Sequence, residues 1–353
     1  MSGRARARAV ALGLAFIVAA CGPSGERNHE SAAGRVSAAI IHGTDSDASQ
    51  DAVVLVMHYD AIQIGGAAAG CSGTLLTPKL VLTARHCVAT TDESAACDSA
   101  GNPTFGGVVS GDHLASKLYA FVGTQRPDFL TGLDRGARGV EIIDDAAKTL
   151  CNHDLALVLL DRALPGGKTA PVRLEGGPRA DETVRVVGWG VTDTSSNPQT
   201  RQQRGGVKVL AVGPGDHLGP SEFKLGESGC AGDSGGPAFA ESSGAVLGVL
   251  SRGGAGARGA TPGDPAACLD AENVFTSAAA FKDLILGAYA KAGQDPWREG
   301  EPDPTTLPPK PPAEASSGCS LGRRVPVRSP ALPEVALALG AVLACLSRRA
   351  TRS

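Results

Sequence analysis

Residues 229–237 read Gly229-Cys230-Ala231-Gly232-Asp233-Ser234-Gly235-Gly236-Pro237. Two earlier stretches accompany it, Leu82-Thr83-Ala84-Arg85-His86-Cys87 and Asn152-His153-Asp154-Leu155-Ala156-Leu157. Each stretch holds one member of a candidate Ser-His-Asp triad, in the chain order His, Asp, Ser. Alone, an Asp-Ser-Gly is typical of a turn and a His beside a Cys is typical of a structural residue. Together, the three stretches favour nucleophilic catalysis.

The chemistry of acyl transfer requires these residue types. The Ser234 hydroxyl is a poor nucleophile until a base removes its proton, and His86 titrates near neutral pH, where it can accept and return one. Asp154 would hold the tautomer of His86 and stabilise the imidazolium. Glycines around Ser234 let the backbone turn tightly, so the N–H groups of Gly232 and Ser234 are candidate donors to an oxyanion.

Composition excludes several classes of protein. The chain has 353 residues and a formal net charge of -3, which gives no reason to expect nucleic acid or an anionic lipid surface as a partner. Its 47 Gly and 4% aromatic residues disfavour a long helical bundle and suit short strands with many turns. No Gly-X-Y period or internal repeat occurs, which excludes collagen and solenoids. The length allows two domains, or one large all-β domain with tails.

Short apolar runs between residues 40 and 290 have the length of strands and are divided by turn residues. They are Ala52–Met57, Leu80–Thr83, Leu155–Leu160, Thr183–Val187, Val207–Val212 and Val246–Leu250. One helical pattern follows over Ser277–Ala290. Many strands and one late helix predict an all-β barrel domain.

The three stretches resemble those of the chymotrypsin/trypsin-like family of serine endopeptidases, and the resemblance extends from Ile40 to about Ala290. It implies two antiparallel six-stranded β-barrels with a C-terminal helix, a protease domain over residues 40–293, protein or peptide substrates and a monomer. The sequence contains neither paired metal-binding histidines nor a glycine-rich phosphate cradle. We therefore expect no cofactor and no metal at the site, and a calcium site stays open.

Ile40-Ile41-His42-Gly43 resembles the mature N-terminus of this family. The resemblance implies that cleavage after Ala39 removes a pro-segment, residues 21–39, and frees an Ile40 amine that pairs with Asp233. The alternative interpretation is that Ile40 and Ile41 start the first strand.

Nine cysteines occur, and three of them (Cys21, Cys319 and Cys345) lie in the terminal segments. The other six allow 15 pairings. The family resemblance implies Cys71–Cys87 and Cys230–Cys268, with Cys97–Cys151 as the remaining pair.

The resemblance assigns the primary specificity pocket to Ser228, Ser251, Gly253 and Asn273. Trypsin-like enzymes carry Asp at the position of Ser228, and without it a buried substrate cation would be unpaired. Asn273 stands where the family often has Gly and would narrow the pocket. We therefore expect a preference for small or medium uncharged residues over Arg and Lys. Glu227 is a rival partner for a substrate cation.

Two further positions depart from the family pattern. Arg85 stands where the family usually has Ala, and we expect its side chain to point outward. Arg252 replaces a usual Trp at the edge of the substrate cleft.

Both ends of the chain read as targeting signals. Residues 1–20 combine arginines with a short apolar run, as in a signal peptide, and Val18-Ala19-Ala20-Cys21 resembles a bacterial lipoprotein box. An ordinary cut after Ala20 is the alternative. Residues 294–317 are Pro-rich and read as a linker. Residues 318–353 resemble a MYXO-CTERM sorting tail processed at Cys319, with a plain C-terminal membrane anchor as the alternative.

These observations predict an exported serine endopeptidase attached to the envelope membrane through a terminal anchor. A catalytically inactive protease fold used as a surface binding module is the first alternative. A surface adhesin or structural protein is the second.

Overall fold

The computed structural model describes residues 40–59, 70–92, 94–129, 131–253 and 264–307 of the chain. Both predicted lipid or sorting cysteines, Cys21 and Cys319, lie outside the described residues. Within the described part of the chain, no helix has the length and apolar character needed to cross a membrane.

The first half of the described chain forms a closed barrel of six antiparallel strands, in the order β10-β11-β4-β3-β2-β9. Its strands are β2 (Val53–His58), β3 (Cys71–Thr77), β4 (Leu80–Thr83), β9 (Leu118–Phe121), β10 (Ala137–Ile143) and β11 (Ala156–Leu160). Each strand hydrogen-bonds two neighbours, so the barrel leaves no open sheet edge.

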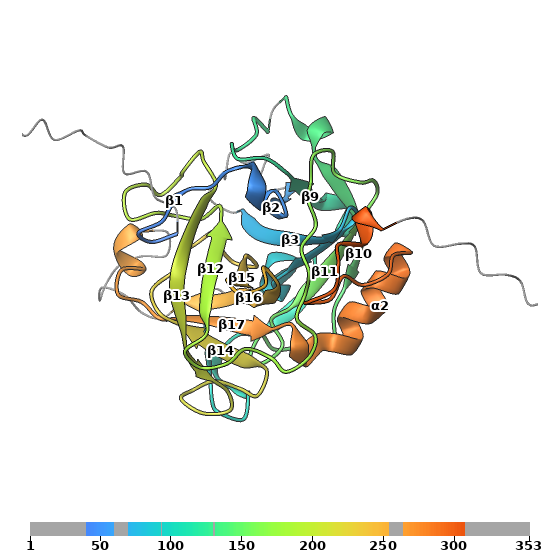
Figure 1. The fold of residues 1–353 in the computed structure, drawn as a ribbon. Helices are drawn as coiled ribbons and strands as arrows, with labels where there is room; N and C mark the ends of the chain where they lie inside the picture. The colour runs from blue at the N-terminus through green and yellow to red at the C-terminus, as the bar shows by residue number, and fades with distance from the viewer. Residues whose placement is uncertain (1–39, 60–69, 93, 130, 254–263, 308–353) are drawn as a thin grey trace, which may run out of the picture. The chain divides into compact units, whose positions relative to one another are not determined.

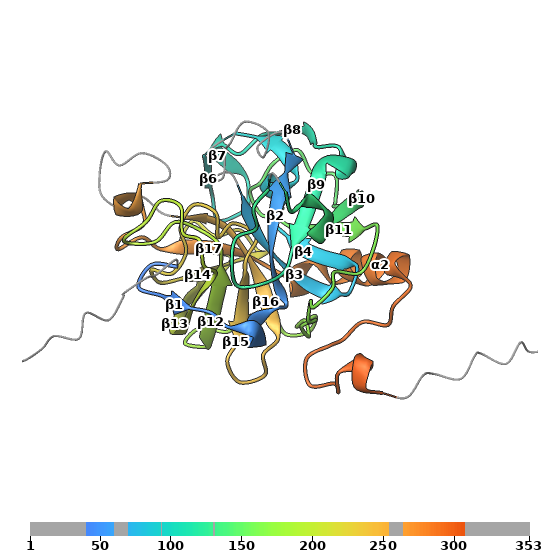
Figure 2. The same cartoon turned by 90° about the horizontal axis from the view of Figure 1, so that it is seen from above.

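The second half forms another barrel, in which β13-β12-β15-β16-β17-β14 closes through a β13–β14 pairing. Its strands are β12 (Thr183–Gly188), β13 (Gln202–Val212), β14 (Glu222–Leu225), β15 (Pro237–Ala240), β16 (Val246–Gly253) and β17 (Asn273–Ser277), and β1 (Thr44–Asp45) adds to the outside of β13. The two barrels lie side by side in both views (Figures 1 and 2). The predicted fold class, two six-stranded barrels with a C-terminal helix, is therefore confirmed.

Alternating residues of single strands supply separate cores. In β4, Val81 packs inside the first barrel, while Leu80 and Leu82 belong to a cluster that includes Val187 and Val249 of the second barrel. This arrangement follows from the two-residue period of a strand, whose side chains point to opposite faces. Because both faces are buried, β4 reads as a continuous apolar run rather than an alternating one.

The C-terminal helix α2 (Lys282–Ala292) covers the shared core with Ile285, Ala288 and Tyr289. The sequence predicted a helix from Ser277, but Asn273–Ser277 is strand β17, and a single 3₁₀ turn precedes α2. Gly293 ends the helix in the left-handed conformation, with φ of 69°, and its N–H bonds back to the last turn. The strand runs expected from the sequence all contain strands, with ends that shift by a few residues.

A segment between β4 and β9 adds two small hairpins to the first barrel. β5 (Ala89–Thr91) pairs with β8 (Val109–Asp112), and β6 (Ala95–Cys97) pairs with β7 (Pro103–Gly106). The disulfide Cys97–Cys151 fastens β6 to the segment that precedes Asp154. The insertion is thereby held close to one of the candidate site residues.

Residues 294–307, which the sequence assigns to the linker, contact the segment that connects β11 of the first barrel to β12 of the second. The backbone of Val172 pairs with both Trp297 and Glu299, at 3.0 and 3.1 Å. Glu299 also accepts two hydrogen bonds from the buried Arg173, at 2.5 and 2.7 Å, and Glu182 accepts a third. The start of the Pro-rich segment is therefore attached to the domain, while the boundary at residue 293 stays a prediction.

We predict that Glu299→Ala destabilises the domain by about 2 kcal/mol, because Arg173 would lose its bidentate partner in a largely buried position. Urea denaturation of matched variants measures the change. Glu175→Ala is the control, since its pair with Lys282 is solvent-exposed and such pairs contribute little. Equal effects of the two substitutions would contradict the role given to Glu299.

Candidate active site

The pairing of β4 with β11 brings His86 and Asp154 together. Ala156 of β11 lies opposite Thr83 of β4, so the residues just before β11 adjoin the turn just after β4. His86 lies in that turn, and Asp154 accepts a hydrogen bond from its backbone N–H at 3.0 Å and contacts its ring Nδ1 at 2.8 Å. A carboxylate only accepts hydrogen bonds, so Nδ1 carries the proton and Nε2 is left as the basic atom.

Asp154 is fully buried, and its carboxylate is satisfied by hydrogen bonds. The Ser251 hydroxyl donates to Oδ2 at 2.7 Å, in addition to the two bonds from His86. Burial raises the pKa of Asp154, but the charge of His86 and the hydrogen bonds from His86 and Ser251 outweigh it, and the pKa lies below its ordinary value. Asp154 is therefore held as a carboxylate.

The imidazole of His86 responds to two opposed effects. Burial lowers its pKa, while the charge of Asp154 and the hydrogen bond to it raise the pKa. The net result is a pKa above the ordinary value of 6.5. The Asp154 contact therefore makes the imidazole a stronger base than burial alone would leave it.

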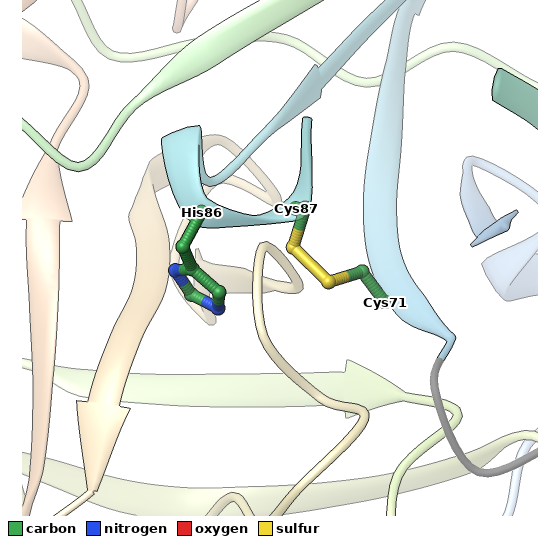
Figure 3. Close-up of side chains that lie close together, drawn as sticks. All are labelled: Cys71, His86 and Cys87. Carbon is green, nitrogen blue, oxygen red and sulfur yellow. A yellow bond between two sulfur atoms is a disulfide. The ribbon is translucent and has the colours of Figure 1, made fainter. Parts of the chain in front are cut away.

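A disulfide lies beside His86. Cys71 at the start of β3 is bonded to Cys87, the next residue after His86 (Figure 3). The Cys71, Cys87 and His86 side chains form a cluster of metal-ligand type, but both sulfurs are held in the disulfide and offer no thiolate. The other two expected disulfides, Cys97–Cys151 and Cys230–Cys268, are also present. All three pairings predicted from the sequence are confirmed.

The turn around Ser234 is built on glycines with positive φ angles, 97° at Gly232 and 75° at Gly235. The N–H of Gly235 bonds to the carbonyl of Leu250 in β16 at 2.8 Å. The next residue along β16 is Ser251, which reaches Asp154. One strand therefore holds the Ser234 turn and contacts the carboxylate that orients His86.

Two N–H groups of this turn remain available. Within the described ranges, neither the Gly232 nor the Ser234 N–H has a hydrogen-bond acceptor. The neighbouring carbonyls are bound: Val191 N–H donates to Ala231 at 2.7 Å and Gly236 N–H donates to Asp233 at 2.8 Å. These are the two groups that the sequence analysis gives as oxyanion donors.

Asp233 is a second buried carboxylate. It accepts hydrogen bonds from the N–H groups of Gly190 at 2.8 Å and Cys230 at 2.9 Å. Burial raises its pKa to about 7, against the effects of these bonds and of the Arg126 charge. Gly190 has no space for a side chain, because a Cβ there would lie 2.5 Å from the carboxylate carbon. At Asp233, the effect of burial on the pKa therefore outweighs the two hydrogen bonds and the Arg126 charge.

Ile40 and Ile41 precede the first strand and are both buried. β1 begins at Thr44, so the alternative that these residues start the first strand is wrong. Ile40 packs among apolar side chains of the second barrel, and the N–H of Ile41 bonds to the carbonyl of Ser228 at 3.0 Å. The segment thus contacts the residues that connect β14 to the Ser234 turn.

The side chain of Asn273 extends from β17 to Ser228 and Gly229, the two residues that follow Glu227. Its Oδ1 accepts hydrogen bonds from Ser228 N–H at 3.1 Å, Ser228 hydroxyl at 2.7 Å and Gly229 N–H at 2.6 Å. On the other side, a Cβ at Gly253 would lie 3.1 Å from the Asn273 Nδ2. The side chain therefore fills the space between Ser228 and Gly253. Ser251, assigned to the same pocket, directs its hydroxyl to Asp154.

The Glu227 carboxylate contacts three other groups of the protein. It contacts His42 at 2.7 Å and Arg204 at 3.2 Å, and it accepts the N–H of Asp270 at 2.6 Å. The expectation that Glu227 competes for a substrate cation is not supported, because Arg204 and the His42 ring already contact its carboxylate.

Arg85 corrects another expectation. Its side chain is only 3% exposed and forms ion pairs with Asp112 and Asp144, so it points inward rather than outward. Asp112 comes from the inserted hairpins and Asp144 follows β10, and neither contact could be read from the residues around Arg85. Burial is tolerated because carboxylates compensate the charge.

Arg252 at the cleft position is likewise paired. Its guanidinium makes two hydrogen bonds to the buried Glu222, at 2.7 and 2.9 Å. Burial raises the pKa of Glu222, but the hydrogen bonds and charge of Arg252 outweigh this and lower the pKa below its ordinary value. The guanidinium is therefore largely neutralised within the protein.

Comparisons with known proteins agree with this architecture. The sequence model of the family described as Trypsin matches residues 57–268. The chain belongs to the trypsin family. No curated protein matches it. One similar solved structure is neuropsin, a serine protease expressed in the limbic system of mouse brain, with 18% identity, coverage of 70% of this chain and 99% of that chain, and a TM-score of 0.48. Another is a mutant of human heparin binding protein, with 19% identity, coverage of 73% of this chain and 100% of that chain, and a TM-score of 0.50.

We predict that His86 of this trypsin-family domain titrates above 6.5 and that Asp154→Asn moves its pKa below 6.5. The substitution removes the charge that raises the pKa and leaves the burial that lowers it. NMR titration of the imidazole resonances measures both values. Asp145→Asn is the control, because Asp145 forms a matched contact with His153 and should shift that histidine alone. An unchanged His86 titration in Asp154→Asn would contradict the assignment.

Proposed function

We propose that this protein is a serine-type endopeptidase that hydrolyses peptide bonds through an acyl-enzyme. The observation that carries the proposal is the contact of His86 Nδ1 with the buried Asp154 at 2.8 Å, beside a Ser234 turn with two unbonded N–H groups. Membership of the trypsin family supports protein or peptide substrates.

In the proposed mechanism, Ser234 Oγ attacks the carbon of the peptide carbonyl while His86 Nε2 takes the Ser234 hydroxyl proton. The Gly232 and Ser234 N–H groups stabilise the oxyanion. His86 then gives the proton to the leaving amine, and the ester remains on Ser234. Water then attacks the ester carbon and loses a proton to His86, the bond from that carbon to Ser234 Oγ breaks to release the acid, and His86 returns the proton to Oγ, which restores the hydroxyl. Asp154 stabilises the imidazolium in both steps without being protonated.

Activation is proposed to follow cleavage after Ala39. A free Ile40 amine would supply a positive charge to Asp233, whose pKa of about 7 in the uncut chain reflects its burial. A buried Ile40 supports this interpretation. Asp233 would then stay ionised, and the turn it belongs to would be stabilised at neutral pH.

The domain is proposed to act outside the cytoplasm. Its three disulfides are typical of exported proteins. A signal peptide over residues 1–20 and a sorting tail over residues 318–353 would export it and attach it to the envelope, with Cys319 holding the active domain after cleavage at Ala39.

The decisive experiment is covalent labelling with a fluorophosphonate, followed by intact mass and peptide mapping. We expect one adduct, on Ser234, in protein cut after Ala39 and none in the uncut protein. Ser234→Ala is the matched control and should not react.

An adduct on both forms would retain the peptidase and remove the role of the Ile40 amine. Folded, cut protein without an adduct would contradict the peptidase and favour a binding module that has kept the residues of the family.

The fine specificity is proposed to be for small uncharged side chains at the residue before the cut bond. We predict that Asn273→Gly raises cleavage after Leu relative to Ala by roughly tenfold or more, because it vacates the space between Ser228 and Gly253. Ratios of kcat/KM on matched peptides measure this. Asn102→Gly, at an exposed Asn, is the control. Equal cleavage after Arg and Ala by the unaltered protein would contradict the preference.

A further inference from the structure

Ser72 is a fully buried residue of β3 whose polar groups are all bonded. Its N–H donates to the carbonyl of Ser234 at 2.8 Å, and its carbonyl accepts the Thr83 hydroxyl at 2.8 Å. Its own hydroxyl lies between two groups of the second barrel, the backbone N–H of Trp189 at 3.0 Å and the carbonyl of Gly232 at 3.1 Å. One residue of the first barrel therefore binds the carbonyls of both Gly232 and Ser234.

The direction of each hydrogen bond is fixed by chemistry. The Trp189 N–H can only donate, so the Ser72 oxygen accepts from it. The Gly232 carbonyl can only accept, so the Ser72 hydroxyl proton points to it. The hydroxyl thus has a single orientation that satisfies both neighbours. Alanine and glycine lack a hydroxyl, so neither can make these two hydrogen bonds.

The backbone N–H groups of three consecutive residues, Trp189, Gly190 and Val191, stabilise the Ser234 turn. Trp189 acts through Ser72, Gly190 binds the Asp233 carboxylate and Val191 binds the Ala231 carbonyl. Since the C=O and N–H of a trans peptide point in opposite directions, binding the Ala231 carbonyl turns the Gly232 N–H away from Val191. Ser72 restrains the following peptide of the same turn through the Gly232 carbonyl.

We propose that Ser72 is a positioning residue that holds the Gly232 and Ser234 N–H groups in the geometry of an oxyanion site. This inference rests on the proposed peptidase function. Ser72 touches no substrate atom in this scheme, and it acts through two backbone carbonyls. Nothing in the sequence around Ser72 signals the role, because its partners lie more than a hundred residues along the chain.

A loss of this restraint should affect the transition state more than substrate binding. The two N–H groups bind charge that develops only during the reaction, so displacing them lowers kcat and leaves KM nearly unchanged. We expect Ser72→Ala to lower kcat roughly ten- to a hundredfold, the effect typical of misplaced groups rather than absent ones. The affinity for a peptide boronic acid, which mimics the tetrahedral state, should fall in parallel.

Thr74→Val is the matched control. Thr74 lies on the same strand and is fully buried, and its hydroxyl has no hydrogen-bond partner among the described residues. Valine keeps its shape, so kcat should be unchanged. If Ser72→Ala raises KM with kcat unchanged, or if both variants lose the same activity, the positioning role is overturned.

Amide hydrogen exchange tests the restraint without activity. In Ser72→Ala, the Trp189 amide and the amides of residues 230–236 should exchange faster than in the unaltered protein, while Thr74→Val should match it. Unchanged exchange would overturn the inference even in an active enzyme. If the unaltered protein hydrolyses no peptide and takes no label, the proposed function fails, and exchange alone decides whether Ser72 holds the turn. Ser72→Gly repeats the test if the alanine variant does not fold.

Discussion

The carboxylate of Asp154 is the constraint around which the site is arranged. A buried charge is costly unless hydrogen bonds and an opposite charge satisfy it. His86 supplies its backbone N–H and its ring, and Ser251 supplies a hydroxyl from the other barrel. The same contacts that make burial tolerable fix the tautomer of His86 and raise its pKa. The same hydrogen bonds therefore stabilise the buried Asp154 carboxylate and set the protonation of His86.

The two barrels divide the work of the site. The first contributes His86 and Asp154 through the β4–β11 pairing, and the second contributes the Ser234 turn. Two hydroxyls link the halves in opposite directions: Ser251 of the second barrel reaches Asp154, and Ser72 of the first reaches Gly232. A relative shift of the barrels would break both links, which explains why a shared apolar core between them matters to the chemistry.

Charged side chains around the site mostly form ion pairs with other side chains of the protein. Arg252 is bound by Glu222, Arg85 by Asp112 and Asp144, and Glu227 by His42 and Arg204. Two of these side chains, Arg252 and Glu227, have positions in the sequence that suggest a role with substrate. Each instead compensates another charge of the fold, so the chemistry available to substrate is narrower than the composition of the three motifs indicates.

The sequence by itself determined the strand pattern and the motifs that hold His86, Asp154 and Ser234, and its resemblance to the trypsin-like family implied the two barrels and the disulfide pairing. The strand pattern follows from local signals, which are apolar runs of strand length divided by turn residues, whereas the two barrels and the cysteine pairs are what the resemblance implies. Only the tertiary structure decided that the Ser251 hydroxyl binds Asp154, that Asn273 spans from Ser228 to Gly253, and that Arg85 faces inward. The physical reason is that a periodic pattern predicts whether a side chain is buried, whereas the partner of a buried polar group comes from a distant segment that the fold alone brings near.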